Sequence, residues 1–311
     1  MPSEPRIAVF VPCLNEELTI ARVIDDFRRT LPAAAIFVID NDSTDRTREI
    51  AIERGARVLV ETRRGKGFAV RTAFRRIDAD VYVMVDGDDT YPAEAVIALL
   101  EPVLAGRADM TVGSRLTAGS SSAFRPLNRL GNRIYPSLLR FLLRVRLTDI
   151  LSGFRVMTRE FVRGVPIAAS GFEIEAELTV KAIERGYRLV ELPIDLRSRP
   201  AGSVSKIRIA SDGWRILWTI ILLFRDYKPM TFFGGLGLLF MLAGLIPGWI
   251  VITEFLETGL VPRFPSAILA AALELAGILL IAVGLVLSAV VHRFQELETK
   301  LDMMSSEPDV E

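Results

Sequence analysis

Three carboxylates cluster at the end of an apolar segment of this chain. Asp86, Asp88 and Asp89 follow directly after the run Val81–Val85. A strand rich in Val and Tyr that ends at such a cluster delivers its acids to the carboxyl edge of a sheet, where open α/β folds bind their ligands. Mg²⁺ is usually held by one or two carboxylates together with substrate phosphates. The pattern predicts a metal and diphosphate site at Asp86 and Asp88, with an Asp/Gly turn of purely local origin as the alternative.

Two further polar turns follow the first two strand-like segments of the chain. Asn15 and Glu16 come after the first, and Asp40 and Asn41 come at the end of the second. If these strands share one parallel sheet, all three turns meet at the same edge. Asn and Asp side chains can accept hydrogen bonds from a base or from ribose hydroxyls, so the turns predict nucleotide binding. The alternative is that Asp42 or Ser43 only caps the next helix.

A short glycine motif, Gly65-Lys66-Gly67, precedes another helical stretch. Lys66 offers a cation, and the glycines offer open backbone N–H groups, on which a phosphate could rest. The motif is not a Walker loop, because the required spacing and the following Ser or Thr are absent.

The elements that must position these residues alternate between two periodicities over the first 115 residues. Repeated βαβ units of this length imply a mostly parallel sheet with helices on both faces. Further along, Ser170–Gly186 fits one helix, while Thr117–Arg133 and Ile194–Lys206 are loop-like. The predicted strands are Ile7–Val11, Ala35–Asp40, Arg57–Val60, Val81–Val85 and Met110–Gly113, and the predicted helices are Glu17–Thr30, Thr44–Arg54, Gly67–Ile77 and Ala93–Leu104.

Two segments near the C-terminus are long and apolar enough to cross a membrane. Residues 230–253 contain no charge, and residues 266–291 contain only Glu274. Each exceeds the roughly 20 apolar residues that a transmembrane helix needs. Gly244 and Gly248 have the spacing of a helix-packing motif, which would suit a homo-oligomer formed through these helices.

Charge places the rest of the chain relative to the membrane. Residues 1–227 carry 34 Lys and Arg against 29 Asp and Glu, whereas residues 228–311 carry 4 against 9. A basic excess just before the first span suits anionic lipids and marks a cytoplasmic side. The segment Ile216–Phe224 is too short to span and is predicted to be an amphipathic surface helix, with a buried core helix as the alternative.

The N-terminus shows no signal peptide, and the single cysteine, Cys13, is compatible with a reducing compartment. We therefore expect an integral membrane protein with its catalytic domain and both termini in the cytoplasm. Membrane lipids are expected partners, and nucleic acid is not. The domain boundaries that follow are 1–206 for the catalytic domain, 207–228 for the juxtamembrane helix, 229–292 for two transmembrane helices and 293–311 for a cytoplasmic tail.

An ordered set of motifs runs through the first 206 residues and resembles family 2 glycosyltransferases. The similarity is strongest to the branch with dolichol-phosphate mannose synthases and bacterial polyprenyl-phosphate glycosyltransferases. It implies a GT-A fold, meaning a Rossmann-like, mostly parallel sheet. The motifs are Pro12-x-x-Asn15-Glu16, Asp40-Asn41-Asp42-Ser43-x-Asp45, Gly65-Lys66-Gly67, Asp86-x-Asp88, Gly113-Ser114-Arg115 and Ser152-Gly153-Phe154-Arg155.

The resemblance implies an inverting transfer of a sugar from a UDP- or GDP-sugar to a polyprenyl or dolichyl monophosphate. Mg²⁺ or Mn²⁺ would bind Asp86 and Asp88, and Asp88 is also expected to be catalytic. Phosphate or lipid acceptor contacts are expected from Arg115, Arg199 and Lys206. Nucleotide binding is predicted, from the turns and the resemblance together, for Pro12, Leu14, Asn15, Glu16, Asp40, Asn41, Lys66, Asp86 and Gly87.

Two further residues are candidates for catalysis. Asp149 is a candidate base or sugar-orienting acid, although a helix-terminal or Arg155-paired carboxylate is the alternative. Arg155 is itself a candidate phosphate partner. The sequence also departs from the family pattern: Asn41 replaces an acid, Asp42 replaces a glycine, and Asp89-Thr90 replaces a frequent Leu-Gln.

Two other functions compete with this one. A processive polysaccharide synthase would be expected to carry Gln-x-x-Arg-Trp and Thr-Glu-Asp motifs, but the chain has one glutamine, Gln295, and no Thr-Glu-Asp. A non-catalytic membrane scaffold with a degenerate nucleotide-binding domain would be expected to have lost its metal acids. Asp86 and Asp88 are both present.

Overall fold

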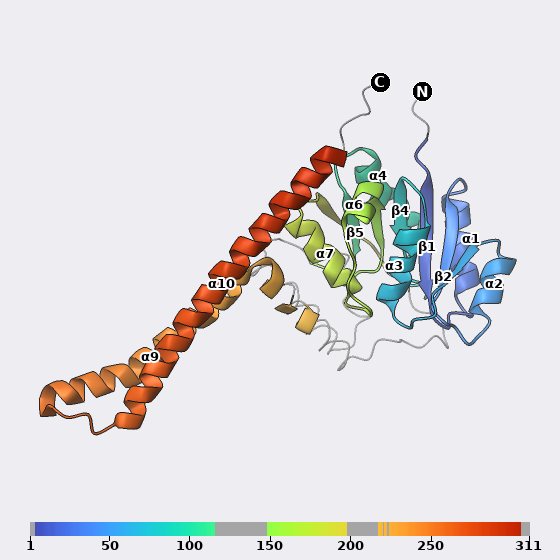
Figure 1. The fold of residues 1–311 in the computed structure, drawn as a ribbon. Helices are drawn as coiled ribbons and strands as arrows, with labels where there is room; N and C mark the ends of the chain where they lie inside the picture. Colours follow the sequence, from blue (N-terminus) through green and yellow to red (C-terminus); the bar gives the residue numbers. More distant parts are fainter. Residues whose placement is uncertain (1–3, 116–147, 198–216, 220, 223, 306–311) are drawn as a thin grey trace. The chain divides into compact units, whose positions relative to one another are not determined.

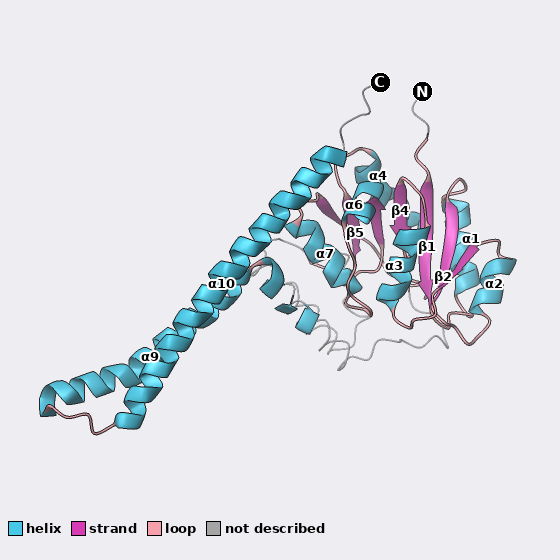
Figure 2. Cartoon of the chain, in the orientation of Figure 1, coloured by secondary structure: helices cyan, strands magenta, loops and turns pink. Residues whose placement is uncertain are grey.

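A computed structural model describes residues 4–115, 148–197, 217–219, 221–222 and 224–305. The chain divides into two compact units, residues 1–220 and residues 221–311. The first unit contains a seven-stranded sheet with helices packed on it, and the second contains two long helices (Figures 1 and 2).

The sheet has the strand order β3-β2-β1-β4-β6-β5-β7. Strand β6 is antiparallel to both of its neighbours, and every other pair is parallel. The first three strands and β4 therefore end at one edge, as the sequence predicts. The strands are β1 (Ile7–Cys13), β2 (Ala35–Asp40), β3 (Arg57–Val60), β4 (Val81–Met84), β5 (Met110–Ser114), β6 (Arg155–Thr158) and β7 (Leu189–Pro193).

Helices cover both faces of the sheet because successive strand residues point to opposite sides. Val9 and Val11 of β1 pack with α1, α2 and α4 on one face, whereas Ala8 and Phe10 pack with α3, α6 and α7 on the other. The elements are α1 (Ile20–Thr30), α2 (Thr47–Glu53), α3 (Lys66–Arg76), the 3₁₀ turn η1 (Ala93–Ala95), α4 (Val96–Leu104), α6 (Arg159–Gly164) and α7 (Ile174–Glu184).

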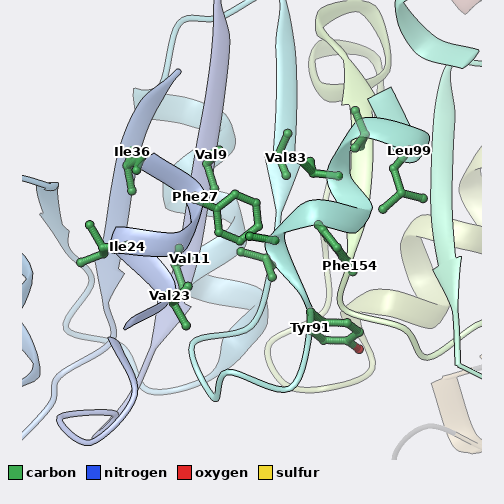
Figure 3. Packing of buried hydrophobic residues seen from close by; sticks show 14 of the residues in the cluster. Val9, Val11, Val23, Ile24, Phe27, Ile36, Val83, Tyr91, Leu99 and Phe154 are labelled. Carbon is green, nitrogen blue, oxygen red and sulfur yellow. The ribbon is translucent and has the colours of Figure 1, made fainter. Parts of the chain in front are cut away.

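The first of these hydrophobic clusters extends to the edge where the polar turns lie. Figure 3 shows Tyr91 and Phe154 at one end of it, with the Tyr91 hydroxyl at the margin of the cluster. Their ring centroids are 5.4 Å apart. The buried cluster thus supports the segment 91–93 and the segment 152–154 at the same point.

The predicted α/β fold is confirmed, and each of the predicted strands and helices up to residue 114 is present in type. The predicted helix Ala93–Leu104 begins with the 3₁₀ turn η1. Strands β6 and β7 and helix α6 are not among the predicted elements. Strand β6 runs antiparallel to both of its neighbours, so it lacks the βαβ context that marked the predicted strands.

The second unit contains the long helices α9 (Pro229–Thr258) and α10 (Phe264–Ser305). Residues 229–258 and 264–294 are long and apolar enough to cross a membrane, and their apolar 18-residue stretches have mean hydropathies of 2.2 and 2.5. The two helices approach closely at glycines: a Cβ on Gly237 would meet the Gly277 carbonyl oxygen at 2.6 Å, and one on Gly244 would lie 3.1 Å from Leu273 Cβ. Gly244 therefore packs within the chain, which gives the Gly244-x-x-x-Gly248 motif an intramolecular role.

Candidate active site

The turn after β4 carries the two predicted metal ligands. Asp88 Oδ1 accepts hydrogen bonds from Thr90 N at 3.2 Å and from Thr90 Oγ1 at 2.6 Å. The Gly87 carbonyl accepts a hydrogen bond of 2.6 Å from Thr19 Oγ1, just ahead of α1. A Cβ on Gly87 would lie 2.8 Å from Cys13 Sγ, so this turn packs closely on the end of β1.

Lys66 and Glu175 form a buried charge cluster with Asp86. Lys66 Nζ makes an ion pair with Asp86 and a second one with Glu175 Oε1 at 2.5 Å. Burial disfavours the charged amine, but the two carboxylates outweigh this effect and raise the pKa of Lys66 above its ordinary value. Lys66 therefore stays a cation beside the predicted metal ligand.

The glycines around Lys66 serve a purpose other than the predicted phosphate cradle. Gly67 N donates to Ser170 O at 3.1 Å, and a Cβ on Gly67 would lie 2.7 Å from the Ala169 carbonyl carbon. Gly65 has a φ of 139° and lies against the Ser170 carbonyl. The motif lets the backbone of residues 169–170 approach the start of α3, and only the Lys66 side chain is directed to the acids.

The turns after β1 and β2 are joined by hydrogen bonds. Asn15 N donates to Ser43 Oγ at 3.0 Å, and Asn15 Oδ1 accepts from Thr44 N at 2.7 Å. Asn15, Asp42 and Asp89 have positive φ angles of 53°, 63° and 57°, one in each of the three strand-end turns. Asn and Asp tolerate this conformation better than other non-glycine residues, and such backbone strain clusters at functional sites.

Asn41 holds the loop that leads to Lys66. Its Nδ2 donates to Glu61 O at 3.1 Å and Arg63 O at 2.6 Å, and its Oδ1 accepts from Gly65 N at 2.7 Å. An acid at this position could not donate to two carbonyl groups. The departure from the family pattern at Asn41 thus has a structural reason. The neighbouring Asp40 accepts from Ser43 N at 3.1 Å, and Pro12 and Leu14 are half-buried at the end of β1.

Glu61 is the second anchor of the same loop. Its carboxylate accepts from Arg63 Nε and Nη2, both at 2.9 Å, and from Thr72 Oγ1 at 2.6 Å. These bonds, led by the Arg63 guanidinium, outweigh the effect of burial and lower the pKa of Glu61 to about 2. The loop is therefore held by an ionised, buried carboxylate at neutral pH.

Asp149 forms a buried ion pair with Arg115. Its oxygens accept from Arg115 Nε at 2.6 Å and Nη2 at 2.7 Å, and from the Arg115 backbone N at 3.0 Å. Burial favours the neutral acid, but Arg115 prevails and holds the pKa of Asp149 below its usual range. Glu191 in turn accepts from Asp149 N at 2.7 Å. The partner of Asp149 is Arg115 and not Arg155, and a carboxylate with a lowered pKa is a weak base.

Arg155 is fully buried, with none of its surface exposed. Its Nε donates to Ser152 O at 2.9 Å, Nη1 to Thr179 Oγ1 at 2.9 Å, and Nη2 to Ile150 O and Glu175 O at 2.8 and 2.9 Å. The remaining N–H contacts Met110 Sδ at 3.6 Å. Burial lowers the pKa of Arg155 to about 10. With every donor taken, Arg155 holds residues 150–155 against α7 instead of facing a phosphate as predicted.

The segment just before β6 supports Asp86. A Cβ on Gly153 would lie 2.7 Å from Asp86 Oδ1 and Cγ, so only glycine allows the carboxylate this position. Gly153 N donates to Tyr91 Oη at 3.1 Å. Asp86 therefore lies between Lys66 of α3 and the backbone of Gly153.

These residues fit a divalent cation that is shared with a substrate. Asp86 and Asp88 supply hard carboxylate oxygens at one turn, which is the donor set that Mg²⁺ and Mn²⁺ prefer. In the part of the chain that the structure describes, no group of three or more His, Cys, Asp or Glu side chains is arranged to hold a metal. The cation would need further ligands from substrate phosphates and water. Asp89 pairs with Arg22 at 3.2 Å and Arg197 at 3.3 Å, so its carboxylate is already engaged.

Comparison with known proteins identifies the family. The sequence profile described as "Glycosyl transferase family 2" matches residues 8–165. The chain belongs to glycosyltransferase family 2. Glycosyltransferase AglJ of Haloferax volcanii is 36% identical over 246 residues, which cover 79% of this chain and 80% of that protein. The dolichyl-phosphate hexose transferase of the same organism is 36% identical over 193 residues, covering 62% and 83%.

A solved structure of a glycosyltransferase confirms the GT-A fold. Glucosyl-3-phosphoglycerate synthase from Mycobacterium tuberculosis, in complex with Mn²⁺, UDP-glucose and phosphoglyceric acid, matches with a TM-score of 0.60 and 25% identity. The match covers 71% of this chain and 80% of that one. The protein is therefore a glycosyltransferase, and the non-catalytic scaffold that the sequence left open is set aside.

The structure adds residues that the sequence pattern does not single out. Glu175 pairs with Lys66, Tyr91 supports Gly153, and Glu61 anchors the loop before α3. The helical spacing of Ser170–Gly186 predicted the helix that carries Glu175 but not which of its acids faces the site. Arg199 and Lys206 lie outside the residues that the structure describes.

Proposed function

We propose that this protein transfers a sugar from a nucleotide-sugar to a polyprenyl or dolichyl monophosphate, with inversion at the anomeric carbon. The observation that carries the proposal is the site at the end of β4, where Asp86 and Asp88 share one turn and Lys66 pairs with Asp86. Such a site suits a diphosphate and its cation. The name of the dolichyl-phosphate hexose transferase supports the acceptor, and the glucosyl-3-phosphoglycerate synthase complex supports the donor and the metal.

Asp86 and Asp88 would hold Mg²⁺ or Mn²⁺, which as a Lewis acid neutralises charge on the departing nucleoside diphosphate. Lys66 adds a fixed positive charge beside Asp86, and Glu175 keeps its amine in place. The turns that contain Asn15, Glu16 and Asp40 are proposed to receive the nucleoside. Asn41 supports these turns by holding the loop before α3 in place.

The acceptor phosphate needs no strong base. Its second pKa of about 6 leaves a phosphate monoester mostly dianionic at neutral pH, so it is already a nucleophile. The low pKa of Asp149 agrees with this requirement, and we assign Asp149 to the orientation of Arg115. Arg115, Arg199 and Lys206 are proposed to bring the anionic acceptor to the donor by charge-assisted hydrogen bonds.

The two apolar helices are proposed to anchor the enzyme where its lipid substrate resides. We place α9 and the apolar part of α10 across the membrane, with residues 1–206 and the tail in the cytoplasm. The described residues 217–219, 221–222 and 224–227 are helical and support a surface helix within residues 207–228. The basic excess before the first span supports the cytoplasmic side.

Separate kinetic measurements on the two substrates test the acceptor. Lys206→Ala should raise the KM for polyprenyl phosphate more than the KM for the nucleotide-sugar, because the cation that it removes is proposed to bind the lipid phosphate. Equal effects on both KM values would argue against a lipid clamp. Incubation with radiolabelled UDP- and GDP-sugars identifies the donor to be used.

A further inference from the structure

Arg197 connects three acidic side chains from separate parts of the first unit. Its Nη1 lies 2.5 Å from Asp26 Oδ2 of α1 and 3.3 Å from Asp89 Oδ1, and its Nη2 lies 2.9 Å from Glu94 Oε2 of η1. The planar guanidinium spreads its five N–H donors over three nitrogens, whereas a lysine has a single charged nitrogen. Arg197 therefore links α1, the turn after β4, and η1.

Asp89, which pairs with Arg197, has a strained backbone conformation. Asp89 has a φ of 57° and is only 3% exposed. Its Oδ2 pairs with Arg22 at 3.2 Å and its Oδ1 with Arg197. A buried carboxylate with a left-handed backbone conformation is maintained only when its surroundings stabilise it. Arg22 and Arg197 stabilise Asp89 through their ion pairs.

Arg197 also touches the residue that orients Asp88. Its backbone N donates to Thr90 O at 2.9 Å, and Thr90 in turn donates from N and Oγ1 to Asp88 Oδ1. The side chain of Arg197 thus fixes Asp89, and its backbone fixes Thr90. These are the two residues that follow Asp88 in the chain.

We propose that Arg197 is a positioning residue for the cation that Asp86 and Asp88 are proposed to hold. The inference rests on the proposed function, because it needs a metal at this turn. Some residues do not touch a metal but hold the side chains that bind it. Substituting such a residue commonly lowers metal affinity by about 10- to 100-fold. Arg197 would set the direction of Asp88 through Asp89 and Thr90 without contacting the metal or either substrate.

The test measures Mn²⁺ binding to the full-length protein in the presence of UDP and, in parallel, GDP, with unbound Mn²⁺ read by electron paramagnetic resonance. Arg197→Ala should weaken binding by about tenfold or more, and Arg197→Lys should weaken it less, because it keeps one of the contacts. Arg29→Ala is the matched control. Arg29 also pairs with Asp26, at 2.6 Å, but no described contact joins it to the turn after β4. Its Mn²⁺ affinity should stay within about twofold of the wild type.

The outcomes separate this inference from the proposed function. If wild type binds Mn²⁺ and both Arg197 variants bind it equally well, the positioning role is overturned. An equal loss in Arg29→Ala also overturns it, because the effect would then come from Asp26. If wild type binds no Mn²⁺ with either nucleotide, the metal site itself is wrong and this inference falls with it. Should Arg197→Ala fail to fold, Arg197→Lys and Asp89→Asn decide the question, and unchanged affinity in both contradicts the proposal.

Discussion

Gly153 lies directly against the Asp86 carboxylate, so that a Cβ on Gly153 would stand 2.7 Å from Asp86 Oδ1. The two residues are far apart in the sequence, and β6 brings them together because it pairs with β4. The Ser152-Gly153-Phe154-Arg155 motif is thereby explained by packing. Gly153 leaves room for Asp86, and Arg155 anchors the segment from inside the protein.

Gly153→Ala should displace Asp86 and lower kcat/KM by about tenfold or more, because ligand geometry at such a site tolerates little movement. Steady-state kinetics at several Mn²⁺ concentrations measures the effect, and extra metal should restore part of the activity. Gly235→Ala is the control, since a Cβ there meets nothing within 4 Å. Wild-type kinetics in Gly153→Ala would show that Asp86 does not need this position.

The ion pairs of Lys66 predict a strong energetic coupling with Glu175. Lys66→Met should lower the free energy of unfolding by about 3–5 kcal/mol, because it leaves a buried carboxylate without its cation. The double variant Lys66→Met/Glu175→Gln should recover part of this loss, since the stranded charge is removed. Thermal unfolding of the single and double variants gives the coupling energy. Additive losses would mean that the two side chains do not interact in solution.

Two substitutions toward the family pattern should differ in their effect on stability. Asn41→Asp should destabilise the protein by about 1–3 kcal/mol, because two carbonyl groups lose their donor and face a carboxylate. Asp42→Gly should be close to neutral, because glycine adopts the φ of 63° without strain and offsets the loss of the Arg64 pair. Thermal unfolding distinguishes the two. A neutral Asn41→Asp variant would contradict the role assigned to the Asn41 amide.

Glu61 should make stability depend on acid pH. Its folded pKa of about 2 lies below the ordinary value of 4.5, so its ionised form stabilises the folded state. That contribution is fully present above about pH 4.5 and is lost as the pH falls toward 2. Glu61→Gln should therefore lower the melting temperature at pH 7, and the difference from wild type should shrink between pH 4.5 and pH 2. Glu49→Gln, at an exposed position of α2, should show no such trend. A difference that is constant with pH would rule out the ionised carboxylate as its cause.

The sequence was sufficient for the elements with clear periodicity and for the acids at their ends. Asp86 and Asp88 could be placed at a sheet edge because β4 is apolar and ends at them. The residues that contact these acids could not be inferred. They depend on which face of a helix packs on the sheet and on which distant strands pair. Glu175 is one of several acids on α7, and only the packed structure shows that it faces Lys66.

Two residues that the sequence analysis assigns to the substrate form hydrogen bonds within the protein instead. Arg155 was predicted as a phosphate partner, and its burial depends on the antiparallel β6, which no local pattern marked. Asn41 is predicted to bind the nucleotide, and its amide donates to the backbone of the loop before α3. In both cases a polar side chain within a motif holds backbone segments in place through hydrogen bonds.

Transfer of radiolabelled sugar to polyprenyl phosphate by the full-length enzyme and by Asp88→Ala tests the central claim most directly. With the UDP- or GDP-sugar that the wild type uses, label should enter the lipid fraction only when Mg²⁺ or Mn²⁺ is present. Asp88→Ala should fold normally and lose this transfer, because the diphosphate loses a ligand of its cation. Wild-type turnover in Asp88→Ala, or no transfer by the wild type with any of these donors, would contradict the account.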